Sequence, residues 1–140
     1  MSLAEKYGFV LFQAEADSPA VRYFIEDHLS FYGYPADVQP SSTTWYGVCR
    51  EGNVYGVVGV RPLSEKTVEV PDFFFQRSRW GILAGYAALE LIKELAIALK
   101  IEVITATPVW NKRMMKAIEK VFGIEVSHYI YRFRPEGVNP

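Results

Sequence analysis

The chain has 140 residues, half of them apolar and 15% aromatic, and its formal net charge is −1. This composition argues against a disordered chain, and the charge gives no overall bias toward nucleic acid or an anionic membrane. The length fits one domain over residues 1–140. The single cysteine, Cys49, excludes an internal disulfide and a cysteine metal cluster. We therefore expect a reducing, cytoplasmic setting and no metal.

The first half of the chain carries three strand patterns and one helix pattern. Residues 1–6 are expected to be a loose end. Apolar or β-rich runs predict strands over residues 9–14, 43–50 and 54–61. Ser18 is a candidate N-cap with Pro19 at the first helical position, and Gly33 is expected to end that helix. We interpret His28 on this helix as a packed side chain, with a catalytic role as the alternative.

The central stretch covers residues 67–100. A predicted strand over residues 67–75 leads through a loop with Arg77 and Arg79 into a long apolar helix that begins near residue 80 or 81. The first N–H groups of a helix lack partners and its dipole is positive at that end, so this loop is a candidate anion site. Three charged residues argue against a membrane span here: Glu90, Lys93 and Glu94.

The last part of the chain is predicted to add a strand over residues 101–106, a helix over residues 110–122 and strand material over residues 124–133. Gly123 is expected to stop the helix. One face of this helix is basic and carries Lys112, Arg113, Lys116 and Lys120. We interpret it as a solvated face, with a binding patch as the alternative.

This order of elements, β-α-β-β-β-α-β-α-β, resembles the GCN5-related N-acetyltransferase (GNAT) superfamily of acyl-CoA-dependent N-acyltransferases. Asn111, Glu119-Lys120 and Gly123 stand where the C-terminal half of the family has its helix-opening asparagine, its Glu-Lys and its glycine. The resemblance implies an α/β (α+β) fold with a mixed, mostly antiparallel sheet flanked by helices. Its fourth and fifth strands, which precede and follow the central helix, are expected to splay apart.

The resemblance also implies acetyl-CoA as co-substrate, with its pyrophosphate on the central loop. The family loop reads Gln/Arg, two residues, Gly, one residue, Gly/Ala. Gly81 can supply its first glycine, whereas Ser78 and Leu83 depart from it. Arg77 and Arg79 are expected to compensate by charge, because guanidinium groups suit phosphate oxygens. The implied cofactor-binding residues are Phe74, Phe75, Arg77, Ser78, Arg79, Trp80, Gly81, Ile82 and Asn111.

Two catalytic residues are candidates by the same resemblance. The tyrosine with which GNAT enzymes often protonate the leaving thiolate is replaced by Ile118, so Tyr129 is the candidate acid, with Tyr131 as the alternative. Glu69 is the candidate general base, with Asp72 as the second choice, since a partly buried carboxylate suits proton removal from an amine. The alternatives are that Glu69 faces solvent, Asp72 shapes its strand, and Tyr129 only packs.

Two functions remain open from the sequence. The first is an N-acetyltransferase acting on a small-molecule or protein amine. The second is a non-catalytic GNAT-like binding or structural module, since some bacteriophage accessory and virion proteins share a GNAT core with a degraded loop. A chance match of an unrelated α/β domain is a third alternative. We expect no nucleic-acid or membrane partner, and a homodimer is a candidate assembly.

Overall fold

The computed structural model describes residues 2–32, 43–106, 112–123, 130–133 and 135–137. In chain order the elements are β1 (Ser2–Lys6), β2 (Phe9–Ala14), α1 (Pro19–Tyr32), β3 (Thr44–Arg50), β4 (Asn53–Ser64), β5 (Thr67–Phe75), α2 (Arg79–Leu99), β6 (Glu102–Ala106), α3 (Lys112–Phe122) and β7 (Ile130–Phe133). Apart from the additional first strand, this is the order that the sequence predicted. No helix in the described residues combines the length and apolar content needed to cross a membrane.

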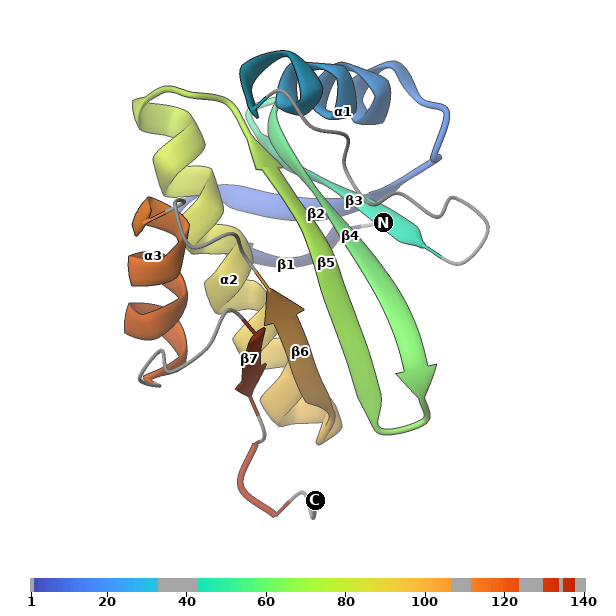
Figure 1. Cartoon of the computed structure of the whole chain (residues 1–140), viewed down its shortest axis with the longest axis vertical. Coiled ribbons are helices and arrows are strands. Elements are labelled where there is room, and N and C mark those ends of the chain that lie inside the picture. The colour runs from blue at the N-terminus through green and yellow to red at the C-terminus, as the bar shows by residue number, and fades with distance from the viewer. Residues whose placement is uncertain (1, 33–42, 107–111, 124–129, 134, 138–140) are drawn as a thin grey trace.

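The described strands form one sheet in which spatial order follows chain order from β1 to β7. Neighbouring strands are antiparallel except β5 and β6, which run parallel and are joined by α2. Parallel neighbours need a long crossover, and a helix supplies it here. The mixed, mostly antiparallel sheet that the sequence predicted is therefore confirmed (Figure 1).

Helices cover both faces of this sheet. α2 runs behind the strands with α3 beside it, whereas α1 lies across the end of the sheet where β5 finishes (Figure 1). On the α2 face, apolar side chains such as Val58, Val70 and Leu89 form the larger core cluster. On the α1 face, Phe24 packs with Trp45 and Phe74 in a smaller cluster. The buried residues of α2 pack against the sheet and α3, whereas Ile82, Leu83, Ile97 and Leu99 of the same helix are exposed.

The expectation of a loose end over residues 1–6 was wrong. Ser2–Lys6 forms β1, which pairs antiparallel with β2. Tyr7 and Gly8 make the two-residue turn with positive φ values of 55° and 81°. This backbone shape matches the twist of paired strands, and glycine adopts it without strain. The sequence prediction missed this strand at the edge of the sheet because three of its five residues are polar.

Helix boundaries follow their capping residues. Ser18 Oγ accepts a hydrogen bond from the Val21 N–H at 3.4 Å, which fits its predicted role as N-cap. α2 begins at Arg79, one or two residues before the predicted start, because Ser78 caps it and accepts from the Gly81 N–H at 3.1 Å. Gly123 follows α3 with a φ of 70°, as expected for a helix stop. The predicted stop at Gly33 lies outside the described residues.

A bulge in β5 changes which face its side chains occupy. Gly59 of β4 is paired with Asp72 and Arg61 with Glu69, so Val70 and Pro71 together oppose a single residue, Val60. The extra residue reverses the alternation of side chains along the strand. Glu69 and Asp72, three residues apart, consequently both point to the α1 face, whereas Val70 joins the core under α2.

Candidate functional site

A cavity of about 130 Å³ lies between the end of β5, the first turns of α2 and the start of α3. The pairing of β5 with β6 ends at Val70 and Thr105, so five further residues of β5 extend past the last pair. α2 and α3 flank this end of β5, which pairs with β4 but, among the described residues, not with β6. The wall is made by Phe73 and Phe75 from β5, Gly81, Ile82, Gly85 and Tyr86 from α2, and Arg113 and Met114 from α3.

The loop that enters α2 is held by its own hydrogen bonds. The Gln76 N–H donates to the Tyr55 carbonyl at 2.8 Å, and the Ser78 N–H donates to the Gln76 carbonyl at 3.0 Å. Gly81 packs directly on this turn, because a Cβ built on it would stand 1.6 Å from the Gln76 oxygen. A glycine is therefore required where helix and loop meet.

This packing identifies a frame of the family loop that the sequence prediction missed. Counted from Gln76, the loop reads Gln, two residues, Arg79, one residue, Gly81. Two of its three defined positions then match the GNAT pattern, and only Arg79 departs from it. Gln76 follows β5 directly, which is the signal that could have set the frame.

The two arginines predicted to bind phosphate occupy different places. Arg77 lines the cavity, but its guanidinium donates two hydrogen bonds to Asp27 on α1, at 2.7 and 3.0 Å. The same group lies 4.0 Å from the centroid of the Phe31 ring. Arg79 is exposed at the first residue of α2 and is not part of the cavity wall. Arg77 therefore lines the cavity with its guanidinium paired to Asp27, whereas Arg79 lies outside the cavity wall.

Trp80 points toward β2–β4 rather than into the cavity. Its ring lies 4.3 Å from the Arg50 guanidinium, and its centroid is 6.3 Å from that of Phe9 and 6.2 Å from that of Tyr55. Its bulk therefore does not narrow the cavity.

The other predicted cofactor residues divide into three groups. Phe75, Gly81 and Ile82 line the cavity. Phe74 lies on the opposite face of the sheet, where it packs with Trp45, and Ser78 caps α2. Asn111 lies outside the described residues.

The candidate base residues lie on the α1 face, across the sheet from the cavity. Glu69 Oε1 accepts a hydrogen bond from Arg61 Nη1 at 3.1 Å, and its side chain is 32% exposed. Asp72 is only 3% exposed. Tyr129 lies outside the described residues. Ile118, at the family's tyrosine position, is fully buried in the core under α2.

Two other residues considered from the sequence have ordinary packing environments. The His28 ring stands 4.6 Å from that of Phe74, and burial lowers the pKa of His28, opposed by the nearby Asp27 carboxylate. Burial raises the pKa of the Cys49 thiol. Both fit the interpretation as packed side chains, because the shifts favour the uncharged forms.

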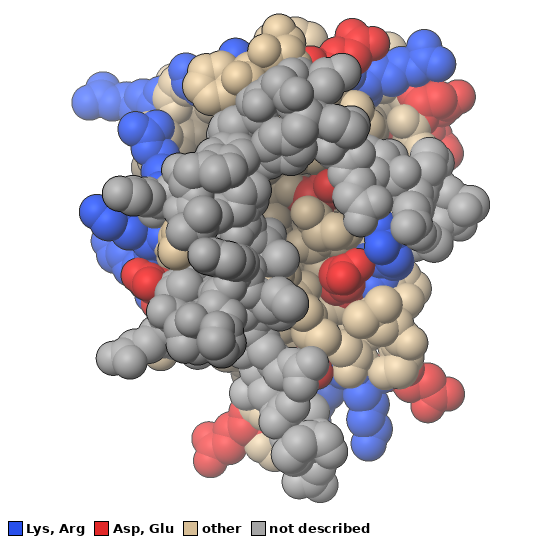
Figure 2. All heavy atoms as spheres, in the orientation of Figure 1, with Lys and Arg blue, Asp and Glu red and all other residues tan. Residues whose placement is uncertain are grey.

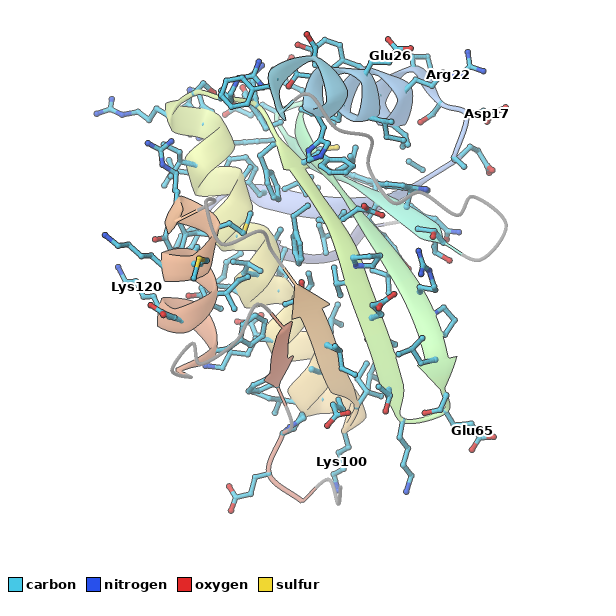
Figure 3. The ribbon with its side chains drawn as sticks, in the orientation of Figure 1. Asp17, Arg22, Glu26, Glu65, Lys100 and Lys120 are labelled. Atoms are coloured by element: carbon cyan, nitrogen blue, oxygen red, sulfur yellow. The ribbon has the colours of Figure 1, made fainter. Side chains whose placement is uncertain are left out.

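Tyr86 and Arg113 line the cavity but were not among the predicted site residues. Tyr86 follows Ile82 by four residues, so helical periodicity places it on the same face. Arg113 belongs to the basic face of α3. Blue side chains gather in Figure 2 at the edge where Figure 1 places α3 and the start of α2. Lys120 projects outward from this edge in Figure 3, with its Nζ 5.7 Å from the Tyr86 ring centroid.

Comparisons with known proteins bear on the fold. No protein-family model and no curated protein sequence matches this chain. Among solved structures, a GNAT-family acetyltransferase from Bacillus anthracis superposes with a TM-score of 0.67 at 13% identity, over 96% of this chain and 98% of that one. The putative N-acetyltransferase YhhK from E. coli, solved bound to coenzyme A, superposes with a TM-score of 0.65 at 13% identity. The match covers 90% of this chain and 98% of that one.

A GNAT-family acetyltransferase from Elizabethkingia anophelis, solved with acetyl-CoA bound, gives a TM-score of 0.59 at 12% identity, covering 82% of this chain and 75% of that chain. The chain has the fold of the GNAT superfamily of acyl-CoA N-acyltransferases.

Proposed function

We propose that this chain binds acetyl-CoA in the cavity between β5, α2 and α3 and transfers the acetyl group to an amine. The observation that carries the proposal is the position of this cavity. It lies where β5 extends past its last pair with β6, beside the start of α2. Solved proteins of the same fold hold acetyl-CoA or coenzyme A, which supports the choice of ligand.

The residues of the cavity fit the two parts of such a ligand. At the start of α2, Ser78 accepts from the N–H groups of Gly81 and Ile82. This leaves the N–H groups of Arg79 and Trp80 without a partner among the described residues. These two residues do not line the cavity but directly precede Gly81 and Ile82, which do, and free N–H groups at a helix start suit a diphosphate. The wall of Phe73, Phe75 and Met114 suits the less polar pantetheine arm.

The backbone of β5 is proposed to polarise the thioester carbonyl. Beyond Val70 the strand has no β6 partner in the described residues, so its N–H groups on that side are available as donors. A fixed donor at an oxygen that gains negative charge stabilises the transition state. The amine nitrogen then bonds to the acetyl carbon, the carbon–sulfur bond breaks, and the thiolate leaves.

Glu69 and a tyrosine are proposed as the base and the acid of the transfer. Glu69 is the proposed base for the amine proton, because it is partly exposed on the α1 face and Arg61 fixes its carboxylate. Tyr129 stays the candidate acid that the resemblance implies. Tyr86 is a second candidate, because its hydroxyl-bearing side chain lines the cavity. Either tyrosine would return a proton to the departing thiolate.

A second candidate function is a binding module that keeps the fold without catalysis. Two observations favour it: Ile118 is buried where the family has a proton donor, and Arg77 is paired with Asp27. Release of free thiol from acetyl-CoA, followed with a thiol reagent in the presence of a panel of primary amines, separates the two functions. We expect at least one amine to accelerate release. Binding of acetyl-CoA with no amine-dependent release would favour the binding module.

A further inference from the structure

The two guanidinium groups that line the cavity differ in their electrostatic surroundings. Arg77 is paired with Asp27 through two hydrogen bonds and stacks on Phe31. Arg113 is exposed, and among the described residues no carboxylate lies within ion-pair distance of it. The charge of Arg77 is therefore largely compensated, whereas that of Arg113 is available to a ligand.

The position of Arg113 complements the start of α2. It stands in the first turn of α3 and lines the same cavity as Gly81 and Ile82 of α2. No acidic residue is among the described residues that line this cavity. An anion there would meet Arg113 from α3, and the free N–H groups of Arg79 and Trp80 lie directly before the cavity residues Gly81 and Ile82 on α2.

We propose that Arg113, rather than Arg77, makes the side-chain contact to the diphosphate of a coenzyme A-type ligand. This inference rests on the proposed function of the same cavity. A guanidinium presents parallel N–H donors that match two phosphate oxygens, which a lysine ammonium does not. The contact would hold the diphosphate between α3 and the start of α2. Arg77 then serves to attach the loop to α1.

The test compares four proteins in calorimetric titrations with coenzyme A and with 3′-dephospho-coenzyme A, which keeps the diphosphate. The proteins are the wild type, Arg113→Ala, Arg113→Lys and Lys116→Ala. Lys116→Ala is the matched control, because it removes one exposed positive charge from the same helix outside the cavity wall. Far-ultraviolet circular dichroism confirms that each variant is folded.

We expect Arg113→Ala to weaken both ligands by about tenfold or more, which is about 1.4 kcal/mol. Arg113→Lys should fall between Arg113→Ala and the wild type, and Lys116→Ala should bind within about twofold of the wild type. Equal weakening of ligand binding by Arg113→Ala and Lys116→Ala would overturn the assignment of this contact to Arg113. The proposal that the cavity binds coenzyme A would still stand. A loss confined to coenzyme A would also overturn that assignment, because the contact would then be to the 3′-phosphate. No binding by the wild type would overturn the proposed function itself.

Discussion

Arg77 donates two hydrogen bonds to the carboxylate of Asp27, at 2.7 and 3.0 Å, across 50 residues of sequence. The pair joins the loop after β5 to helix α1, and Phe31 adds a ring beneath the guanidinium. The loop that begins α2 is thereby attached to the opposite layer of the fold. The position of the cavity wall thus depends on a contact with the helix across the sheet.

Replacing Asp27 with Asn should reduce stability modestly. The Arg77 side chain is 46% exposed, so solvent screens the pair, and a loss of about 0.5–1 kcal/mol in the free energy of unfolding is expected. Urea denaturation measures it. Glu26→Gln is the matched control, because Glu26 is the neighbouring residue on α1 and projects away from the loop (Figure 3). Equal losses of unfolding free energy in the two variants would show that the Asp27–Arg77 pair makes no specific contribution to stability.

Two glycines of α2 should respond in opposite ways to alanine. A Cβ at Gly81 would stand 1.6 Å from the Gln76 oxygen, so Gly81→Ala forces the backbone to shift and should cost about 1–3 kcal/mol. A Cβ at Gly85 meets the Phe75 ring at 3.6 Å, an ordinary contact. Gly85→Ala should be neutral or stabilising by up to about 1 kcal/mol through helix propensity. Thermal unfolding of the two variants distinguishes these outcomes. A Gly81→Ala variant as stable as the wild type would contradict the described packing of Gly81 on the loop.

His28 should make stability depend on pH below neutrality. Burial lowers its pKa from the ordinary 6.5, with the Asp27 carboxylate acting in the opposite direction. The unfolded chain then binds the proton more readily, so the stability present at neutral pH is lost as pH falls through 6.5 toward the lower folded pKa.

The measurement for His28 is the change in urea midpoint between about pH 7.5 and pH 5.5, on either side of the ordinary histidine pKa. His28→Gln removes the titrating group, so its midpoint should fall less over this interval than that of the wild type. The comparison uses the difference within each protein, which separates titration from any packing loss. An identical change in urea midpoint in the wild type and His28→Gln would show that His28 does not contribute to the pH dependence of stability.

Glu69→Gln should impair transfer without preventing acetyl-CoA binding. Loss of a general base typically lowers the rate by about 10²–10⁴-fold. Because Glu69 lies on the face of the sheet opposite the cavity, the dissociation constant of acetyl-CoA should be unchanged. Glu65→Gln, at the exposed turn between β4 and β5 (Figure 3), is the control for loss of one acidic residue. Full activity of Glu69→Gln would exclude it as the base and direct attention to Asp72.

The sequence predicted the order of the elements because the residues that start and stop helices are local signals. Pro19 after Ser18 and the glycine after α3 mark helix ends, and the apolar content of α2 marks a buried crossover. The strand β1 was missed because three of its five residues are polar and its pairing depends on the Tyr7–Gly8 turn. A short edge strand leaves little hydrophobic periodicity to detect.

The site was harder to predict because its geometry depends on contacts between distant segments. The pairing of Arg77 with Asp27 cannot be inferred from either local sequence. The bulge that turns Glu69 and Asp72 to one face depends on the register between β4 and β5. Arg113 looked like part of a solvated basic face, and only the packing of α3 against α2 places it at the cavity.

Binding of acetyl-CoA in this cavity is tested most directly by calorimetric titration of the ligand into the wild type and two charge-introducing variants of α2. Ile82→Glu places a carboxylate at the cavity wall, where Ile82 is 37% exposed. Ile97→Glu is the matched control, because Ile97 is 51% exposed near the other end of the helix. We expect micromolar binding by the wild type and Ile97→Glu, and at least tenfold weaker binding by Ile82→Glu. No binding by the wild type at millimolar ligand, or equal binding by all three, would contradict it.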